Sequence, residues 1–188
     1  MSRIATFTTS MGTFKAELYA EKMPITVGNF IDLANGGFYD GVHFHRVIPN
    51  FMNQFGCPYA RESASPKAGT GGPPANSTFA SCTGEMYTRT TDGGIPDEVG
   101  EPQMRITNAE GTLSMANTGS PETGGSQFFI NVRDNTFLDW FDTSTESAHP
   151  VFGKIVDNYT LVQQISRAPT RNDNPVAPIK MLSVRVDY

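Results

Sequence analysis

Two stretches near the start of the chain alternate apolar and polar residues, which is typical of half-buried β-strands. Residues 4–9 and 13–20 show this pattern on either side of a short Ser-Met-Gly turn. In the second stretch Phe14, Ala16 and Leu18 lie on one face, with polar residues between them. The chain is therefore predicted to begin with a β-hairpin.

Two later stretches follow the helical period instead. After Pro24, which suits the first position of a helix, apolar residues recur at spacings of three and four until Gly36 and Gly37 end the pattern. A second helix is predicted from Asn158, which we interpret as its N-cap, to the residues before Pro169.

The other predicted strands are short and almost all lie outside a loop-rich middle. Residues 56–125 hold 12 of the 18 glycines and 7 of the 13 prolines, and only 112–116 is strand-like there. The remaining strands are predicted at 43–48, 51–55, 127–132, 151–156 and 180–186, the last with Leu182, Val184 and Val186 on one face. Many short strands with two helices favour one mainly β domain over 1–188, either a closed barrel or an open α+β sheet.

Composition and charge exclude several classes of partner. The net charge is −5 and no two Lys or Arg residues are adjacent, so the clustered positive charge of a nucleic-acid-binding protein is missing. No apolar run exceeds three residues, and the N-terminus lacks the apolar segment of a signal peptide, so no membrane association is expected. We expect a cytoplasmic monomer in which Cys57 and Cys82 remain thiols.

Residue spacing gives little support for a metal site or a nucleophile. His43 and His45 share one strand face, but two ligands are too few for a closed zinc site, so one packed and one hydrogen-bonded histidine is favoured. Ser126, Asp139 and His149 follow the chain order of an α/β-hydrolase triad, but the second glycine of the nucleophile elbow is absent. The hydrolase is kept as a minor alternative, and no metal or other cofactor is expected.

Three motifs combine large apolar residues with single polar side chains. Residues 44–54 read F-H-R-V-I-P-N-F-M-N-Q, residues 112–117 read T-L-S-M-A-N, and residues 124–130 read G-G-S-Q-F-F-I. This mixture is typical of an apolar pocket with a few orienting hydrogen bonds. Because side chains alternate along a strand, one of each adjacent apolar pair is expected to face the core.

Through these motifs, and through V-F-G-K at 151–154, the chain resembles the cyclophilins, a family of peptidyl-prolyl cis–trans isomerases. The resemblance runs over essentially the whole length. It implies a closed eight-stranded antiparallel barrel capped by two α-helices, with a filled core and a peptide groove on the outer face. It also implies that the partners are proline-containing peptides and unfolded or loop segments of proteins.

The resemblance assigns catalysis to Arg46, whose guanidinium would donate a hydrogen bond to the prolyl nitrogen. An X–Pro bond prefers trans by only about 0.5–1 kcal/mol, yet the barrier between the isomers is about 18–20 kcal/mol. In the twisted state conjugation is lost and the nitrogen regains a lone pair. A donor that binds this state lowers the barrier without any nucleophile or metal.

The resemblance also carries over the residues that bind the peptide. Those similar to the proline pocket of the family are Phe51, Met52, Phe129 and Leu138, with His149 at the edge. Those similar to the positions that hold the peptide are Gln54, Asn117 and Gln127, with Ala116 in contact with it.

One departure from the family pattern concerns inhibition. Phe137 stands where many eukaryotic cyclophilins have tryptophan, so an indole N–H that can bond the macrocycle cyclosporin is missing. We expect normal proline isomerisation but weakened cyclosporin binding, unless Trp140 swings in to replace that donor.

Two segments are longer than in compact cyclophilins. Residues 75–92 read as an insertion, interpreted either as a tolerated surface loop or as a segment that borders the groove beside 69–72 and restricts the residue before proline. Residues 140–148 form an extended loop. A proline-peptide binding module with little catalysis is the alternative function, which Arg46 disfavours because binding alone does not need its donor.

Overall fold

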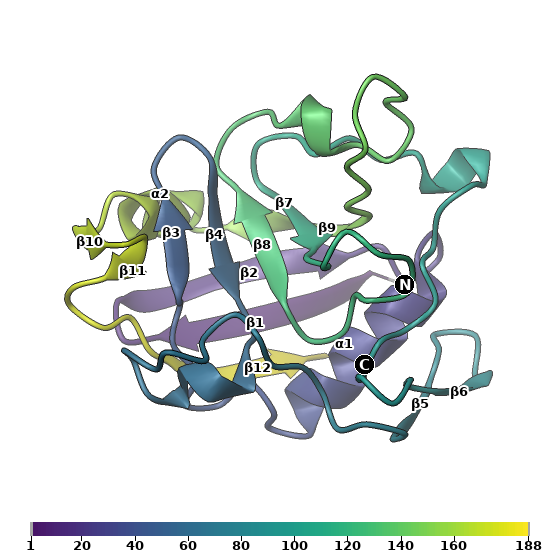
Figure 1. Ribbon diagram of the computed structural model, residues 1–188, viewed down its shortest axis with the longest axis horizontal. Coiled ribbons are helices and arrows are strands. Elements are labelled where there is room, and N and C mark those ends of the chain that lie inside the picture. Colours follow the sequence, from purple (N-terminus) through teal and green to yellow (C-terminus); the bar gives the residue numbers. More distant parts are fainter. Residues whose placement is uncertain (1, 188) are drawn as a thin grey trace.

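The computed structural model describes residues 2–187, and Figure 1 shows how their elements are arranged. The two α-helices are α1 (Pro24–Asn35) and α2 (Tyr159–Ser166). The strands of the large sheet are β1 (Arg3–Thr9), β2 (Gly12–Leu18), β3 (Arg46–Ile48), β4 (Met52–Phe55), β7 (Thr112–Met115), β8 (Phe128–Asn131), β9 (Val151–Asp157) and β12 (Met181–Val186). Smaller elements are β5 (Thr78–Ala80), β6 (Met86–Thr88), β10 (Thr170–Arg171), β11 (Asn174–Pro175) and the 3-10 turns at Pro58–Arg61, Pro102–Met104 and Thr136–Leu138.

The eight-stranded antiparallel sheet and two helices are as predicted, but the barrel is not closed. The strands run in the order β12-β1-β2-β9-β7-β8-β4-β3, and no ladder joins β3 to β12. A single bridge between His43 and Lys180 lies across that gap, together with the hydrogen bond from the amide of Phe44 to the carbonyl of Ile179 (3.0 Å). The strand predicted at 43–48 starts only at Arg46, because His43 and Phe44 pair with Lys180 and Ile179 instead.

Alternation explains the strands of the first hairpin. Phe7 and Phe14 are paired across β1 and β2, and their rings stack with centroids 4.7 Å apart in the core. The prediction for β12 is wrong at Leu182, which is 51% exposed although Val184 and Val186 are buried. The pairing of β12 with β1 shifts by one residue there, so the bulge turns this side chain to the outside.

The helices cover the open ends of the curled sheet. Pro24 occupies the first turn of α1 as predicted, and Glu98 accepts the amides of Ile25 and Thr26 with its two carboxylate oxygens, at 2.8 Å each. Asn158 is the N-cap residue of α2 as predicted, but its side chain makes no capping hydrogen bond. Its backbone is left-handed and its side chain donates to the carbonyl of Thr13 (2.8 Å).

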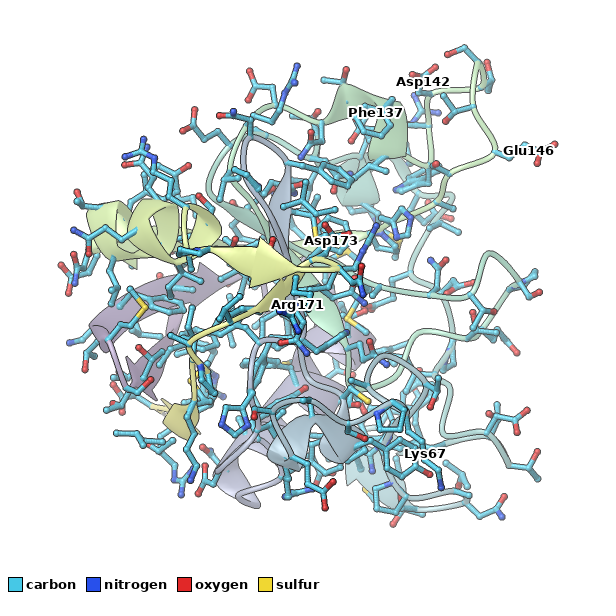
Figure 2. All side chains as sticks on the ribbon, turned by 60° about the vertical axis from the view of Figure 1, so that its left-hand side comes forward. Lys67, Phe137, Asp142, Glu146, Arg171 and Asp173 are labelled. Atoms are coloured by element: carbon cyan, nitrogen blue, oxygen red, sulfur yellow. The ribbon has the colours of Figure 1, made fainter. Side chains whose placement is uncertain are left out.

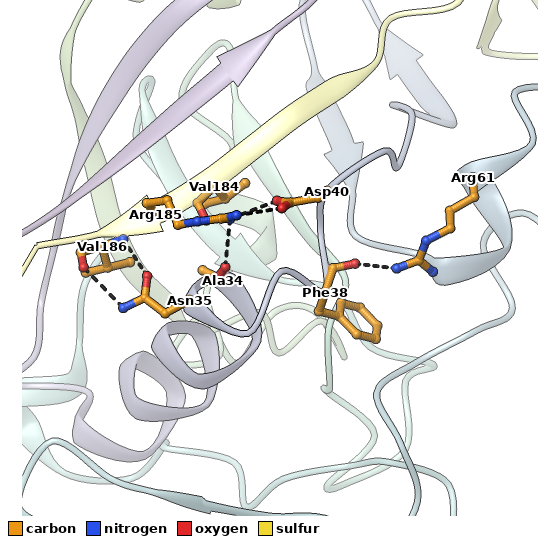
Figure 3. Close-up of polar contacts among 8 residues, drawn as sticks. All are labelled: Ala34, Asn35, Phe38, Asp40, Arg61, Val184, Arg185 and Val186. Carbon is orange, nitrogen blue, oxygen red and sulfur yellow. Dashed lines mark hydrogen bonds and ion pairs between the residues drawn. The ribbon is translucent and has the colours of Figure 1, made fainter.

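The end of β12 is fastened to α1 and to the loop that follows it (Figure 3). Arg185 makes two bonds to the carboxylate of Asp40, at 2.8 and 2.6 Å, and Asn35 exchanges two hydrogen bonds with the backbone of Val186. Nearby, Arg61 donates to the carbonyl of Phe38 (2.8 Å). These contacts lie at the C-terminal end of α1 and hold the last strand of the sheet to the helix.

Residues 75–92 contain regular structure that the sequence pattern did not predict. Strands β5 and β6 form a hairpin that packs on α1, at the lower right of Figure 1, and Phe79 is buried beneath it. Only the end of the segment approaches residues 69–72, where a Cβ added to Gly72 would lie 3.6 Å from the carbonyl oxygen of Asp92. The expectation that the segment borders the groove beside residues 69–72 stays a prediction.

Candidate functional site

The outer face of the sheet carries a row of side chains that crosses three strands. Arg46 in β3 is paired with Gln54 in β4, and Gln54 is paired with Phe129 in β8. Directly paired residues of antiparallel strands point to the same face, and neighbouring strands lie about 4.8 Å apart. Arg46 and Phe129 therefore stand on either side of Gln54 on one surface.

An apolar cluster lies beside this row and is separate from the main core. Met52, Phe129 and Leu138 are buried together. Ile48, Phe51 and Ala116 are partly buried against them. Phe128, next to Phe129, points the other way into the main core, as the alternation predicted. The prediction is wrong for Phe51 and Met52, which both pack in this cluster because Phe51 lies in the turn before β4. We refer to these six residues, Ile48, Phe51, Met52, Ala116, Phe129 and Leu138, as the apolar cluster.

Two further rings extend the apolar cluster. Phe137 is 47% exposed at the edge of the molecule (Figure 2), and its ring stacks on Phe51 with centroids 6.0 Å apart. The imidazole of His149 meets the ring of Phe129 nearly edge-on, at 5.4 Å. Burial lowers the pKa of His149, and a hydrogen bond between its Nδ1 and the carbonyl of Met115 (2.9 Å) opposes part of that shift.

Hydrogen bonds join the polar residues into a second group, which we call the polar row: Arg46, Gln54 and Gln127. Arg46 donates from Nη1 to Oε1 of Gln54 (3.3 Å), and Gln54 donates from Nε2 to Oε1 of Gln127 (3.0 Å). Gln127 in turn donates to the carbonyls of Gly69 and Gly71, at 3.0 and 2.8 Å. These bonds fix the orientation of both side-chain amides and leave the Arg46 side chain at the exposed end.

Asn117 follows Ala116, whose amide donates to the carbonyl of Gln127 (3.1 Å), and its side chain ties two loops together. Its Nδ2 donates to the carbonyl of Ala148 (2.7 Å), and its Oδ1 accepts the amide of Gly119 (3.0 Å). The amide of His149 also donates to the carbonyl of Leu138 (3.1 Å). The extended loop 140–148 is therefore anchored at its end, close to the apolar cluster.

A buried polar network supports the apolar cluster, and sequence reasoning missed it. The carboxylate of Asp139 accepts the backbone amide and the side-chain amide of Asn108, at 2.7 and 2.8 Å, and the hydroxyl of Thr107 (2.7 Å). Asn135 donates to the carbonyl of Phe51 and to Oδ1 of Asn131, at 2.9 Å each. No sequence signal marked it, because Asn131 ends β8 whereas Asn108 and Asn135 lie in loops, where asparagine is common.

The two strand histidines behave as expected from the sequence. His43 pairs through Nδ1 with the carbonyl of Ala60 (2.9 Å), whereas His45 is packed, 8% exposed, behind Gly69. Neither ring nitrogen of His45 has a hydrogen-bond partner among residues 2–187. Burial lowers the pKa of His45 to about 4, and the positive charge of Arg46 adds to the effect. Within the described part of the chain, no cluster of three or more His, Cys, Asp or Glu residues is placed to hold a metal ion.

The residues of the possible hydrolase triad each have other partners. Ser126 donates to the carbonyl of Gly56 (2.7 Å), Asp139 is occupied by Asn108, and the Nδ1 of His149 bonds the carbonyl of Met115. No hydrogen bond that would form a nucleophile and base pair is made between Ser126 and His149. The geometry gives no support to acyl transfer.

The indole of Trp140 has partners of its own. Its indole N–H donates to the carbonyl of Met104 (3.4 Å), and the guanidinium of Arg105 lies 5.9 Å from its ring centroid. The indole donor is thus engaged elsewhere.

No helix within residues 2–187 is long and apolar enough to cross a membrane.

Comparison with known proteins gives one consistent family. Residues 4–186 match the family model described as cyclophilin type peptidyl-prolyl cis-trans isomerase/CLD. A "peptidyl-prolyl cis-trans isomerase-like 1" from Aspergillus fumigatus is 37% identical over 99% of this chain and 96% of its own length. A "peptidyl-prolyl cis-trans isomerase" from Acinetobacter baylyi is 34% identical over 95% of this chain and 82% of its own length.

Solved structures agree with the sequence relatives. A cyclophilin-type isomerase from Cryptosporidium parvum superposes with a TM-score of 0.76 at 25% identity, covering 100% of this chain and 99% of that one. A second crystal structure with the same description, obtained in the presence of the dipeptide Ala-Pro, gives a TM-score of 0.75 at 25% identity over 98% of this chain and 99% of its own.

Proposed function

The chain belongs to the cyclophilin-type peptidyl-prolyl cis-trans isomerase family, and we propose that it catalyses X–Pro rotation by a hydrogen bond from Arg46 to the prolyl nitrogen. Its relatives are named for this activity, so the chain is an isomerase. The proposal concerns which residues perform the reaction and how each contributes.

The observation that carries the proposal is the paired register of Arg46, Gln54 and Phe129. It places one fixed cation on the same face as an apolar cluster that can accept a pyrrolidine ring. A proline packed against Phe129 and Met52 would turn its nitrogen toward the polar row. The exposed guanidinium of Arg46 is the charged donor of that row, and arginine keeps its proton in proteins.

Such a donor acts on the twisted state rather than on the substrate. In a planar amide the nitrogen lone pair is delocalised and accepts hydrogen bonds poorly, whereas in the twisted amide it is available. An interaction present only in the transition state raises kcat rather than lowering KM. Gln54 supports this role because its amide oxygen holds Nη1 of Arg46 in place.

We assign the remaining residues to peptide binding. The apolar surface for the proline ring is formed by Phe51, Met52, Phe129 and Leu138, with His149 and Phe137 at its edge. Hydrogen bonds to the peptide backbone would come from Gln54, Gln127 and Asn117, with Ala116 in van der Waals contact. The side-chain oxygen and nitrogen of Gln54 and Gln127 can bind the peptide only through lone pairs and N–H groups that their bonds within the protein do not use.

The experiment compares wild type with Arg46→Ala by NMR exchange on an Ala-Pro peptide. We expect kcat to fall about 10²- to 10³-fold, the cost of removing one transition-state donor, with a much smaller change in KM. Arg61→Ala is the control, because Arg61 is another exposed arginine whose bonds go only to the backbone at Pro58 and Phe38. Arg46→Lys should recover part of the rate, since it keeps the charge but not the planar fork.

The same measurement distinguishes the isomerase from the alternative, a proline-peptide binding module with little catalysis. A binding module would hold the Ala-Pro peptide without accelerating exchange, and Arg46→Ala would leave the exchange rate unchanged. Isomerase activity that survives intact in Arg46→Ala would overturn the assigned mechanism.

A further inference from the structure

The hairpin of residues 75–92 is bound tightly to α1. A Cβ added to Gly28 would lie 2.5 Å from the carbonyl oxygen of Ala80, so the helix and β5 approach at backbone distance. The amide of Cys82 also donates to the carbonyl of Pro24 (2.9 Å). The hairpin is therefore an integral part of the surface of α1 rather than a free loop.

Arg89, in this segment, is an almost fully buried cation. It is 2% exposed, and its guanidinium carbon lies 4.7 Å from the ring centroid of Phe79. Its three nitrogens donate to Oδ1 of Asn29 (2.9 Å), Oγ of Ser77 (2.9 Å) and Oδ2 of Asp32 (2.7 Å). A buried charge is costly unless it is paired and hydrogen-bonded, so these partners hold Arg89 in one position.

Arg89 determines the orientation of the Asn29 side chain. Asn29 is 1% exposed, and its oxygen accepts Nε of Arg89. The other end of the amide must then face the opposite direction, where Nδ2 donates to the carbonyl of Gly125 (2.8 Å). Without Arg89 the buried oxygen of Asn29 would lose its donor, and this orientation would no longer be fixed.

The backbone at Gly125 is packed closely against Pro73 and Gly93, the residues on either side of the segment. A Cβ on Gly125 would lie 2.8 Å from Cδ of Pro73 and 2.9 Å from the carbonyl oxygen of Gly93. The amide of Ile95 donates to the carbonyl of Gly124 (2.9 Å). Gln127, a member of the polar row, follows two residues later along the chain.

We propose that Arg89 is a positioning residue for peptide binding, which acts through Asn29 and the backbone of Gly125 to place Gln127. This proposal rests on the proposed function, because it assumes that Gln127 holds the substrate. It gives the segment 75–92 a role at the site even though its hairpin lies on α1.

The first test is Arg89→Met, which keeps the length of the side chain but removes every donor. We expect KM for an Ala-Pro peptide to rise about three- to tenfold, the value of one or so net hydrogen bonds, with kcat within about twofold of wild type. Gln127→Ala should raise KM by a similar or larger factor. The double variant should be no worse than Gln127→Ala alone, because both act through the same side chain.

A second variant keeps the proposal testable if Arg89→Met fails to fold. Asn29→Asp retains the acceptor for Arg89 but replaces the donor to Gly125 with an oxygen, so the same rise in KM is expected. Arg185→Met is the control, since it breaks a two-bond pair with Asp40 (Figure 3) in which neither Asn29 nor Gly125 takes part. It should change the free energy of unfolding but not KM.

A spectroscopic readout separates this proposal from the proposed function. The side-chain amide of Gln127 donates to Gly69 and Gly71, so its NMR resonances report its position without any assay of activity. We expect them to shift in Arg89→Met and Asn29→Asp but not in Arg185→Met. Unshifted resonances with an unchanged KM, or effects of Arg89→Met and Gln127→Ala that multiply, overturn the positioning role. A wild-type protein without isomerase activity would overturn the proposed function, and the resonances would still decide the positioning role.

Discussion

The apolar cluster and the polar row lie side by side, but they are supported by different parts of the chain. Asp139, Asn108 and Asn131 support the apolar cluster, and most bonds of this network join residues within 31 positions of one another. Gln127 is held instead by Gly69, and Gly125 by Asn29, across separations of 58 and 96 residues. The network beside the proline surface is thus mostly local, apart from the bond from Asn135 to the carbonyl of Phe51 across 84 residues. The Gln127 end of the polar row depends on distant segments.

This difference suggests which half can vary. A network of buried amides and one carboxylate specifies one arrangement, because a buried polar group that loses its hydrogen bonds costs free energy. A support assembled from distant loops can be altered by lengthening one of them, since loop extension costs little entropy. The segment 75–92, which the sequence predicts to be an insertion, would be such a change, and it lies next to Gly93, which approaches Gly125.

The largest expected effect comes from breaking the local support. Asp139→Ala removes a buried carboxylate that accepts three hydrogen bonds, two of them from Asn108. We expect the free energy of unfolding to fall by about 4.5 kcal/mol or more, because each of the three bonds to a charged group is worth about 1.5–3 kcal/mol and the donors stay buried. Urea denaturation measures this change.

Asp142→Ala is the matched control, three residues further along the chain and only partly buried, at the edge of the molecule (Figure 2). Its carboxylate bonds only to Ser144, the residue two positions on. We expect no measurable change in stability. Equal effects of the two substitutions would contradict the supporting role of the network.

The sequence predicts local features of the site better than it predicts contacts between distant segments. Phe128 and Phe129 were separated correctly onto opposite faces, the main core and the apolar cluster, because strand alternation is a local rule. Local pattern also predicted the two helices. It could not predict that Leu182 would turn outward, since the bulge arises from the pairing with β1.

Hydrogen bonds between distant residues could not be predicted from sequence patterns. The polar residues of 75–92 indicated only a loop, because the partners that bury Arg89 are Asn29 and Asp32, about 60 positions earlier. The open edge between β3 and β12 has the same origin. Whether the last pair of strands forms a ladder depends on how the whole sheet curls.

The second prediction concerns the polar row and pH. His45 lies behind Gly69 with a pKa lowered to about 4, so the folded protein keeps it neutral while the unfolded chain binds a proton below about 6.5. The free energy of unfolding should therefore fall as pH drops from 6.5 to 4, by about 3 kcal/mol from this residue. Above pH 6.5 the residue contributes no pH dependence.

His45→Phe tests this by removing the titrating group while keeping a ring of similar size. Thermal or urea unfolding of both proteins across pH 4 to 7 should give curves that diverge toward the acid end, the wild type losing more stability. Parallel curves would show that burial of His45 does not set the acid sensitivity of this side of the site.

The smallest expected effect concerns the edge of the apolar cluster. Phe137 stacks on Phe51 and offers no N–H, and the indole of Trp140 is engaged by Met104, so we expect wild-type binding of cyclosporin to be weak. Phe137→Trp adds one donor at the exposed edge and should strengthen binding about tenfold, the value of one net hydrogen bond. Isothermal titration with the macrocycle measures the change, and Trp140→Phe is the control, expected to leave the affinity as it is. Nanomolar binding by the wild type, lost in Trp140→Phe, would mean that Trp140 leaves Met104 to supply the donor, and the apolar side would then be less rigid than its local network implies.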